Sequence, residues 1–379
     1  MTRHKRRKIA GIIRLCILLG FPLMIAFTVK GIPAMRNFLE KVGNIRIENG
    51  SETSHTPDTS TGTSSTENPD RFTTTTEEIS QKEPSTDVLT ETENPLEKNS
   101  ENSGDKPYPT SWTTGGAIVR TTYGQYSGNS FFNLDNGGQV NNQTSIPNET
   151  LLSESRCGAD FTVEDTSEPL VLIYHTHTTE SFEPYVRDFY DANFNYRTTD
   201  ETKNMIMVGD AIQAELEAQG IGVIHARDIH DYPSYNGSYG RSRETIQPIL
   251  EQYPSIKVVL DIHRDAVAGE GVAYQPYVEI NGKEAGQIMI ISGCDDGTLG
   301  MPDFMKNFHF ACRLQEQLEN DYSGLTRPIL FDYRHYNQDL TTGSLLIEVG
   351  SHGNTLEQVQ YSGQLIGSAL GRLLNSMKG

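Results

Sequence analysis

The sequence predicts an α/β fold in its C-terminal half: a mostly parallel central sheet with helices on both faces. Three observations support this. Apolar runs of strand length recur, from PLVLIYH near residue 170 to SLLIEVG near residue 345. Segments with a helical spacing of apolar residues separate them, and the runs are apolar throughout rather than alternating. Such strands, alternating with helices, are typical of a parallel sheet that is covered on both faces.

The expected elements follow one another closely from residue 167 to the C-terminus. The predicted strands are PLVLIYH, IGVIHA, KVVLDIH, GQIMIIS, RPILFDY and SLLIEVG. The predicted helices are KNMIMVGDAIQAELEAQGI, which Gly220 is placed to end, SRETIQPILEQY, which Ser242 is placed to cap, and FMKNFHFACRLQEQLENDY. Residues 106–166 are rich in turn-forming residues, so we expect a lead-in subdomain there and the catalytic domain over 167–379.

The charge of the chain divides it into parts with different physical roles. The 379 residues carry a net charge of -19, which argues against nucleic acid as a partner. The first 49 residues, however, hold 10 basic and two acidic residues, whereas residues 50–105 hold 13 acidic and three basic ones. A basic start followed by an acidic polar stretch indicates two non-catalytic segments ahead of the folded part.

The first of these segments is a predicted membrane anchor. Residues 1–8 form a basic cytoplasmic N-terminus, and the apolar run 9–29 is long enough, at about 1.5 Å per residue, to span a bilayer core of about 30 Å. The alternative is a cleaved signal peptide, but GIPAM offers a poor cleavage site. We therefore expect a single-pass protein of the cell membrane with its C-terminal domain outside the cytoplasm.

The second segment, residues 30–105, is a predicted disordered linker. It is dominated by Ser, Thr, Glu, Asp, Asn and Pro, as in TPDTSTGTSSTENPD. Such a composition buries too little apolar surface to offset the entropy of ordering the chain. The linker would let a folded domain reach away from the bilayer.

Metal-ligating and charged residues lie at the ends of three of the predicted strands. They are His175, His177 and Glu180 after the first, Asp261, His263 and Arg264 in the third, and Glu348 in the last. Active sites of open α/β sheets collect at the carboxyl ends of strands. A single histidine after a strand is usually a hydrogen-bonded structural residue, but two such strands with acidic companions favour a site.

These residue types suit a catalytic zinc ion, which takes three protein ligands and one water. His177, Glu180 and His263 would be the ligands, and Glu348 would act as the general base. His175 would pack or hydrogen-bond beside the ligands.

Two further residues have supporting roles in this hypothesis. Asp261 would orient His263, and Arg264 would either bind a substrate carboxylate or pair with Asp265. A serine or cysteine nucleophile is disfavoured, because there is no G-x-S-x-G motif and Cys294 lacks electropositive neighbours. The other histidines of the folded part are interpreted as structural or surface residues: His225, His230, His309, His335 and His352.

Several motifs together resemble the stage II sporulation protein P family: VLIYHTHTTESF, SYGRSRETI, VVLDIHRDA, YNQDL and LLIEVGSHGNTLEQ. Its members are membrane-anchored cell-wall hydrolases of endospore-forming bacteria, related in fold to zinc N-acetylmuramoyl-L-alanine amidases. The resemblance implies one zinc ion and cleavage of the bond between muramic acid and the stem peptide, together with endopeptidase action on cross-links. It also implies a role in engulfment, with stage II sporulation proteins D and M as partners.

Residue by residue, the resemblance places the family's metal histidines at His177 and His263 and its catalytic glutamate at Glu348. The third ligand stays open between Glu180 and Glu201, because related amidases take a glutamate from near Asn204. Two alternatives remain: a non-catalytic peptidoglycan-binding scaffold, and a zinc carboxypeptidase that acts on stem peptides.

Overall fold

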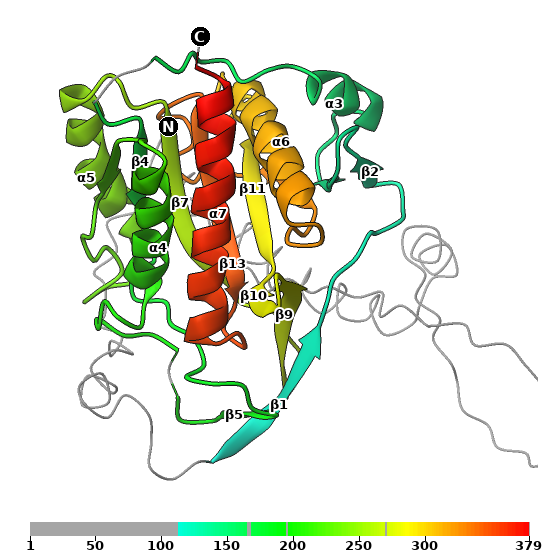
Figure 1. Cartoon of the computed structure of the whole chain (residues 1–379), viewed down its shortest axis with the longest axis vertical. Coiled ribbons are helices and arrows are strands. Elements are labelled where there is room, and N and C mark those ends of the chain that lie inside the picture. The colour runs from blue at the N-terminus through cyan, green and yellow to red at the C-terminus, as the bar shows by residue number, and fades with distance from the viewer. Residues whose placement is uncertain (1–112, 165–167, 195, 270, 379) are drawn as a thin grey trace, which may run out of the picture. The chain divides into compact units, whose positions relative to one another are not determined.

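The computed structural model describes residues 113–164, 168–194, 196–269 and 271–378, all within one structural unit. The predicted anchor and linker, residues 9–29 and 30–105, lie outside the described residues. No helix within the described ranges is both long enough and apolar enough to cross a membrane. Figure 1 shows how the described elements are arranged.

The centre of the fold is an eight-stranded sheet in the order β2-β3-β12-β11-β13-β7-β4-β6. In chain order the strands are β2 (Phe131–Asn133), β3 (Gln139–Asn142), β4 (Val171–Tyr174), β6 (Val223–His225), β7 (Val258–Asp265), β11 (Ile288–Cys294), β12 (Ile329–Tyr333) and β13 (Gly343–Ser351). Strands β13, β7, β4 and β6 run parallel to one another, whereas β11 is antiparallel to β13 and β2 to β3.

The α/β class is therefore confirmed, and the large sheet is mixed. Five of its seven strand pairings are parallel, and two, β2–β3 and β11–β13, are antiparallel. The reason for the direction of β11 lies between β7 and β11. The chain there forms strands joined by short turns, without a crossover helix. A parallel connection needs a crossover, so without one the next strand is free to return antiparallel.

A second sheet has the order β10-β9-β1-β5, with β8 paired to β9. Its strands are β1 (Thr114–Thr121), β5 (Phe189–Asp191), β8 (Ala268–Gly269), β9 (Val272–Ile280) and β10 (Lys283–Gly286). Strands from the expected lead-in region join both sheets, since β1 pairs with β9 and β3 with β12. The domain boundary at residue 166 stays a prediction, but strands on its two sides share their hydrogen bonds.

Five described helices surround the strands: α3 (Asn148–Glu154), α4 (Met205–Ala218), α5 (Ser238–Gln252), α6 (Phe304–Asp321) and α7 (Leu356–Ser376). The expectation of helices on both faces is confirmed. In Figure 1, α4, α6 and α7 lie side by side over one face of the large sheet. On β4, Ile173 packs in the same core cluster as residues of α7, whereas Leu172 and Tyr174 pack with Ile246 of α5.

Helix α7 is the longest described helix, and our sequence prediction lacked it. Its start carries a capping box, in which Thr355 and Gln358 bond to each other's backbone N–H groups. Val359, Ile366 and Leu370 then recur at helical spacing and are fully buried. The signals were present, but frequent glycine and serine residues lowered the apparent helix propensity of the segment.

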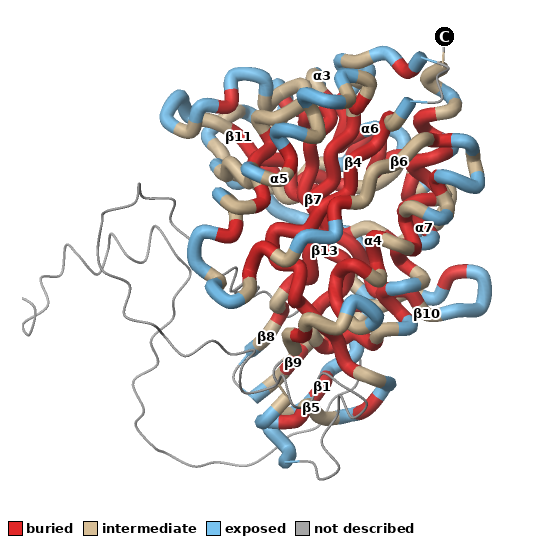
Figure 2. Tube along the Cα trace, turned by 90° about the vertical axis from the view of Figure 1, so that its left-hand side faces the viewer, coloured by how far each residue is buried: buried red, intermediate tan, exposed pale blue. Residues whose placement is uncertain are grey.

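Alternation along the central strands decides where the polar residues lie. On β7, Leu260 and Ile262 face the core under α4 and α7, so Asp261 and His263 face the opposite side. On β13, Ile347 faces the same core, so Glu348 also faces the α5 side. Figure 2 shows that β4, β7 and β13 are buried along the centre of the molecule. Asp261, His263 and Glu348 thus start from one face.

Candidate active site

The carboxyl ends of β4, β7 and β13 meet at one edge of the large sheet, because these strands are adjacent and parallel. Within the β7–β13 pair, Glu348 is the direct register partner of His263. The loop after β4 brings His177 to the same place: its ring centroid is 5.2 Å from that of His263, with the rings nearly perpendicular. Three of the predicted site residues therefore converge.

His177 packs against residues at and just before the start of α5. Its ring stacks on Tyr235, with centroids 4.4 Å apart. Its Nε2 is 3.1 Å from the Tyr235 hydroxyl, and its Nδ1 is 3.4 Å from the hydroxyl of Ser238. Burial, together with the nearby charges of His263 and Arg197, holds the pKa of His177 well below its usual value. The ring is therefore neutral, as a metal-binding imidazole must be.

His263 is held between two carboxylates. Its Nε2 is 2.8 Å from Oδ1 of Asp261, although the angle is not that of a hydrogen bond, and its Nδ1 is 3.9 Å from Oε2 of Glu180. Burial disfavours charge on the ring, but the carboxylate of Asp261 outweighs it and raises the pKa of His263 to about 9. Asp261 is itself fixed by hydrogen bonds from the backbone and side chain of Thr176. The carboxylate of Asp261 thus lies against Nε2 of His263, and Nδ1 faces Glu180.

Glu180 is buried in a positively charged setting. It accepts a hydrogen bond of 3.0 Å from the backbone N–H of Arg264. The guanidinium groups of Arg197 and Arg264 lie 3.6 and 3.9 Å from its other oxygen. These contacts hold the carboxylate in place, 3.9 Å from Nδ1 of His263. As a metal ligand, Glu180 would share its charge with two arginines.

Among the carboxyl groups of the site, that of Glu348 has the fewest hydrogen bonds and ion pairs to offset its charge. It is buried, and its Oε2 has no hydrogen-bond partner. Burial first, and then repulsion from Asp265, raise the pKa of Glu348 to about 8. A carboxyl group that gains or loses its proton near neutral pH is suited to acid–base catalysis.

His175 lies on the other face of the sheet from His177. Its Nε2 is 2.8 Å from Nε2 of His225, and its Nδ1 is 3.0 Å from the carbonyl oxygen of Ile262. Both rings pack against Gly209 of α4. Residues two apart on a strand would share a face, but the strand ends at Tyr174 and the chain turns over residues 176–179. His177 therefore reaches the α5 side, whereas His175 does not.

The two remaining charged positions differ in setting. Glu201, the reserve ligand, is half exposed and pairs with Arg227 at 2.6 Å. Asp265 pairs with Arg327 at 2.7 Å in a buried ion pair, while Arg264 turns its guanidinium toward Glu180. The buried Nε of Arg264 has no hydrogen-bond partner, which leaves a donor for a ligand.

Sequence reasoning missed four residues around the cluster of His177, Glu180, His263 and Glu348, which is called the crevice below. Tyr235, Ser238 and Tyr239 surround His177, and α5 begins at Ser238, four residues before the predicted cap. The glycine at position 237, which has a φ of 80°, was a usable signal for that earlier start. His352 was interpreted as structural or surface, yet its Nδ1 is buried without a partner. Burial and Arg264 lower its pKa to about 3.

The donor set at the crevice fits a zinc ion. It offers the neutral imidazole of His177 and the imidazole of His263, which has Nε2 against Asp261 and would release its proton on binding a metal. It also offers two buried glutamates, one with an unpartnered oxygen. The potential ligand atoms of the crevice are, however, spaced more widely than those of a second cluster. Within the described ranges, three potential ligand atoms lie within 4.8 Å of one another at Glu154, Cys157 and His309.

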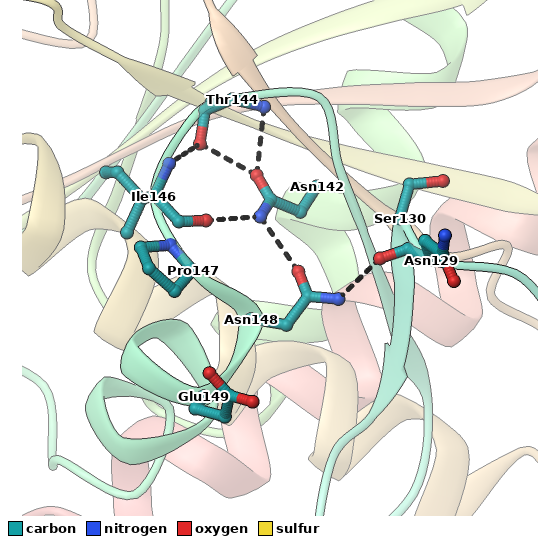
Figure 3. A pocket seen from close by; sticks show the side chains of 8 residues that line it. All are labelled: Asn129, Ser130, Asn142, Thr144, Ile146, Pro147, Asn148 and Glu149. Atoms are coloured by element: carbon teal, nitrogen blue, oxygen red, sulfur yellow. Dashed lines mark hydrogen bonds between the residues drawn. The ribbon is translucent and has the colours of Figure 1, made fainter. Parts of the chain in front are cut away.

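A polar hollow lies elsewhere, between β2, β3 and α3 (Figure 3). Its amide groups satisfy one another: Asn142 donates to the carbonyl of Ile146 and to the side chain of Asn148, which donates to the backbone of Asn129. None of the predicted site residues lines it. This hollow therefore does not carry the chemistry of the crevice.

The chain is similar to an N-acetylmuramoyl-L-alanine amidase of Nostoc punctiforme (12% identity, 55% of this chain and 96% of that one, TM-score 0.33). It is also similar to one of Clostridium difficile 630 (16%, 56% and 97%, TM-score 0.33) and one of Mycobacterium smegmatis (12%, 57% and 100%, TM-score 0.32).

The sequence comparisons are more specific. The chain is 30% identical over 202 residues to stage II sporulation protein P of Bacillus subtilis (strain 168), over 50% of this chain and 47% of that one. It thus spans about half the length of the curated relative it matches. The family model described as stage II sporulation protein P matches residues 32–371, which is most of the sequence. This chain therefore belongs to the stage II sporulation protein P family.

Proposed function

We propose that this protein is a zinc-dependent peptidoglycan hydrolase of endospore formation, which cleaves the amide bond between N-acetylmuramic acid and L-alanine. Membership of the family supports the sporulation role. The observation that carries the chemistry is the juxtaposition of Glu348, with its unpartnered oxygen, and His263 beside the neutral ring of His177. Cleavage of peptide cross-links by the same crevice is part of the proposal.

The proposed metal ligands are His177, His263 and Glu180. Asp261 faces Nε2 of His263 and so leaves Nδ1 for the metal, on the side where Glu180 lies. Glu201 is disfavoured, because it is engaged with Arg227 at the surface. When zinc is bound, it supplies Lewis acidity that polarises a carbonyl group and makes water a better nucleophile.

Glu348 would perform the proton transfers. Its raised pKa makes the carboxylate a strong enough base to accept a proton from the attacking water, and the protonated form can then donate to the departing amine. Burial keeps bulk water from exchanging that proton. His263, the register partner, lies beside the carboxyl group on the same face of the sheet.

Arg264 would bind a carboxylate of the stem peptide. Its Nε is buried without a hydrogen-bond partner, and its guanidinium lies beside Glu180. An anionic substrate group would satisfy that donor, and guanidinium is suited to carboxylates. Tyr235 and Tyr239 form an aromatic wall next to His177 that would hold the substrate.

The setting proposed for this activity is the space outside the cytoplasmic membrane during engulfment. Residues 9–29 would anchor the chain and residues 30–105 would tether the domain. Stage II sporulation proteins D and M are the proposed partners. If the anchor is retained, the full-length chain stays in the membrane fraction; a mature N-terminus just beyond Ala34 would show cleavage instead.

The decisive experiment is mass spectrometry of the fragments that the purified protein releases from sacculi, with and without a chelator. An amidase exposes a new L-alanine amine and leaves the lactyl group on the sugar. Release of single amino acids would identify a carboxypeptidase, and wall binding without any product would identify a scaffold. His177→Ala should lose activity and the metal of the crevice together, since two protein ligands hold zinc poorly.

A further inference from the structure

A cluster of three different donor types lies where α3 meets α6. Glu154 ends α3, Cys157 follows three residues later, and His309 is in the second turn of α6. One potential ligand atom of each lies within 4.8 Å of those of the other two. We propose that these residues form a second metal site, which binds zinc or a similar transition metal and is separate from the crevice.

The donor set selects the class of metal. A thiolate, an imidazole and a carboxylate together suit zinc, whereas magnesium and calcium prefer oxygen ligands. Ligand atoms around tetrahedral zinc lie about 3.3–3.8 Å apart, as follows from the usual bond lengths. Small side-chain movements would bring the three ligand atoms to that spacing. Cys157 is exposed and Glu154 partly so, which leaves both side chains free to move.

Asp160 places His309 in the form that a metal requires. Nδ1 of His309 is 2.6 Å from Oδ2 of Asp160, so Asp160 accepts the proton on that nitrogen. Nε2 then faces Glu154, whose Oε2 is 2.8 Å away. Metal-binding histidines usually donate their other ring N–H to a carboxylate in this way, which fixes the tautomer and the ring orientation.

The backbone that carries these side chains is held in place. Leu151 of α3 is fully buried in the main core, and Phe161 packs edge-on against Phe310, with centroids 5.3 Å apart. Val163 forms a bridge with Lys378 beyond α7. The ligands are therefore presented by fixed elements, as a metal site requires. Figure 1 shows α3 beside the start of α6.

The cluster lies away from the crevice. Strand β11 is antiparallel to β13, so the connection from β11 to α6 leaves the sheet at the end opposite to that of Glu348. A metal here would take no part in the proposed hydrolysis. It would instead tie the end of α3 to α6, and the site does not depend on the proposed function being correct.

A metal-free alternative exists for the same geometry: a protonated His309 held between Glu154 and Asp160. The two cases differ at Cys157. A purely ionic cluster has no use for the thiol, whereas a metal site engages the sulfur directly. Cys157 forms no disulfide with any cysteine in the described part of the chain, so its sulfur is available as a ligand.

Cobalt substitution tests the site in the full-length protein, purified in detergent and stripped of metal with a chelator. One equivalent of Co²⁺ at this site should give a sulfur-to-cobalt charge-transfer band in the near ultraviolet. Cys157→Ser, a surface change, should remove the band while the thermal unfolding midpoint without metal stays the same. Asp160→Asn should keep the band but weaken the affinity for Co²⁺ roughly 10–100-fold, the usual effect of losing such a partner.

The matched control is His177→Ala, which removes a ligand of the crevice and not of this cluster. It should keep the band, so failure of the crevice hypothesis and failure of this one are separable. A wild-type protein without the band, or a band that survives Cys157→Ser, would refute the second site and identify His309 as part of an ion pair only.

Discussion

Glu348 lies directly beside His263 across the parallel strands β13 and β7. Side chains of neighbouring parallel strands at one register position point to the same face. The position of the proposed base relative to a proposed metal ligand is thus set by backbone hydrogen bonds of two buried strands. A base held in this way needs no loop to order before it can act.

Glu348→Gln separates the base from the metal ligands. The variant should fold and keep its metal, yet lose roughly 10²–10⁴-fold in turnover, because a positioned acid–base group is usually worth that much. Turnover on sacculi, metal content and the thermal unfolding midpoint measure the three quantities. Glu251→Gln, an exposed change on α5, is the control. Loss of metal in Glu348→Gln would make Glu348 a ligand and Glu180 the better candidate for the base.

The buried ion pair of Arg327 and Asp265 predicts a large loss of stability. Both side chains are less than a tenth exposed, with Nη1 and Oδ2 2.7 Å apart. Arg327→Gln leaves the Asp265 carboxylate buried without its partner, which should lower the free energy of unfolding by about 3–5 kcal/mol in denaturant titrations. Arg156→Gln is the matched control, since its pair with Asp135 is more than half exposed. It should leave the unfolding free energy nearly unchanged; equal losses would contradict the argument.

Asp339 predicts an acid dependence of stability. Its two oxygens accept hydrogen bonds of 2.7 Å from Arg243. Partial burial opposes its ionisation, but hydrogen bonds from His335 and Arg243 outweigh burial and hold the pKa of Asp339 well below its usual value.

The sign follows from linkage. Because the folded pKa is below the unfolded value of about 3.9, the stabilisation is present above about pH 5 and is lost as the pH falls below about 4. Asp339→Asn should therefore lower the free energy of unfolding by about 1–2 kcal/mol at pH 7. The gap to the wild-type protein should shrink in acid. Curves that stay parallel from pH 7 to pH 3 would contradict this.

Two glycine-to-alanine changes should have opposite effects on stability. At Gly209 of α4, a Cβ would lie 2.5 Å from Nε2 of His225 and 2.9 Å from Nε2 of His175. The paired rings would have to move, so we expect a loss of about 1–3 kcal/mol in spite of the better helix propensity of alanine. At Gly240 of α5, a Cβ meets nothing within 4 Å, so alanine should stabilise the protein by up to about 1 kcal/mol. Thermal unfolding of both variants checks the pair.

Sequence reasoning reached the part of the site that buried strands dictate. His263 and Glu348 could be placed because continuous apolar runs identify their strands, and parallel strands carry residues to a shared edge. His177 follows from the same rule. Features that depend on tertiary structure could not be predicted. They are the reversed direction of β11, and the approach of Tyr235 from the loop before α5 and of Tyr239 from its first turn. The separation of His175 from His177 depended on where the chain turns after Tyr174.

Strand β13 has consequences for how this family can vary in length. Its odd-numbered apolar residues fill the core under α7, while Glu348 faces the crevice. Deleting or inserting one residue within the strand would exchange the two faces, placing a carboxylate among aliphatic side chains and an isoleucine or valine in the crevice. Such a change would disrupt the core and the crevice together, so folding and activity would both be lost. Insertions and deletions among relatives should therefore be excluded from β13 and tolerated in the loops at its ends, whereas substitutions that preserve the alternation can accumulate.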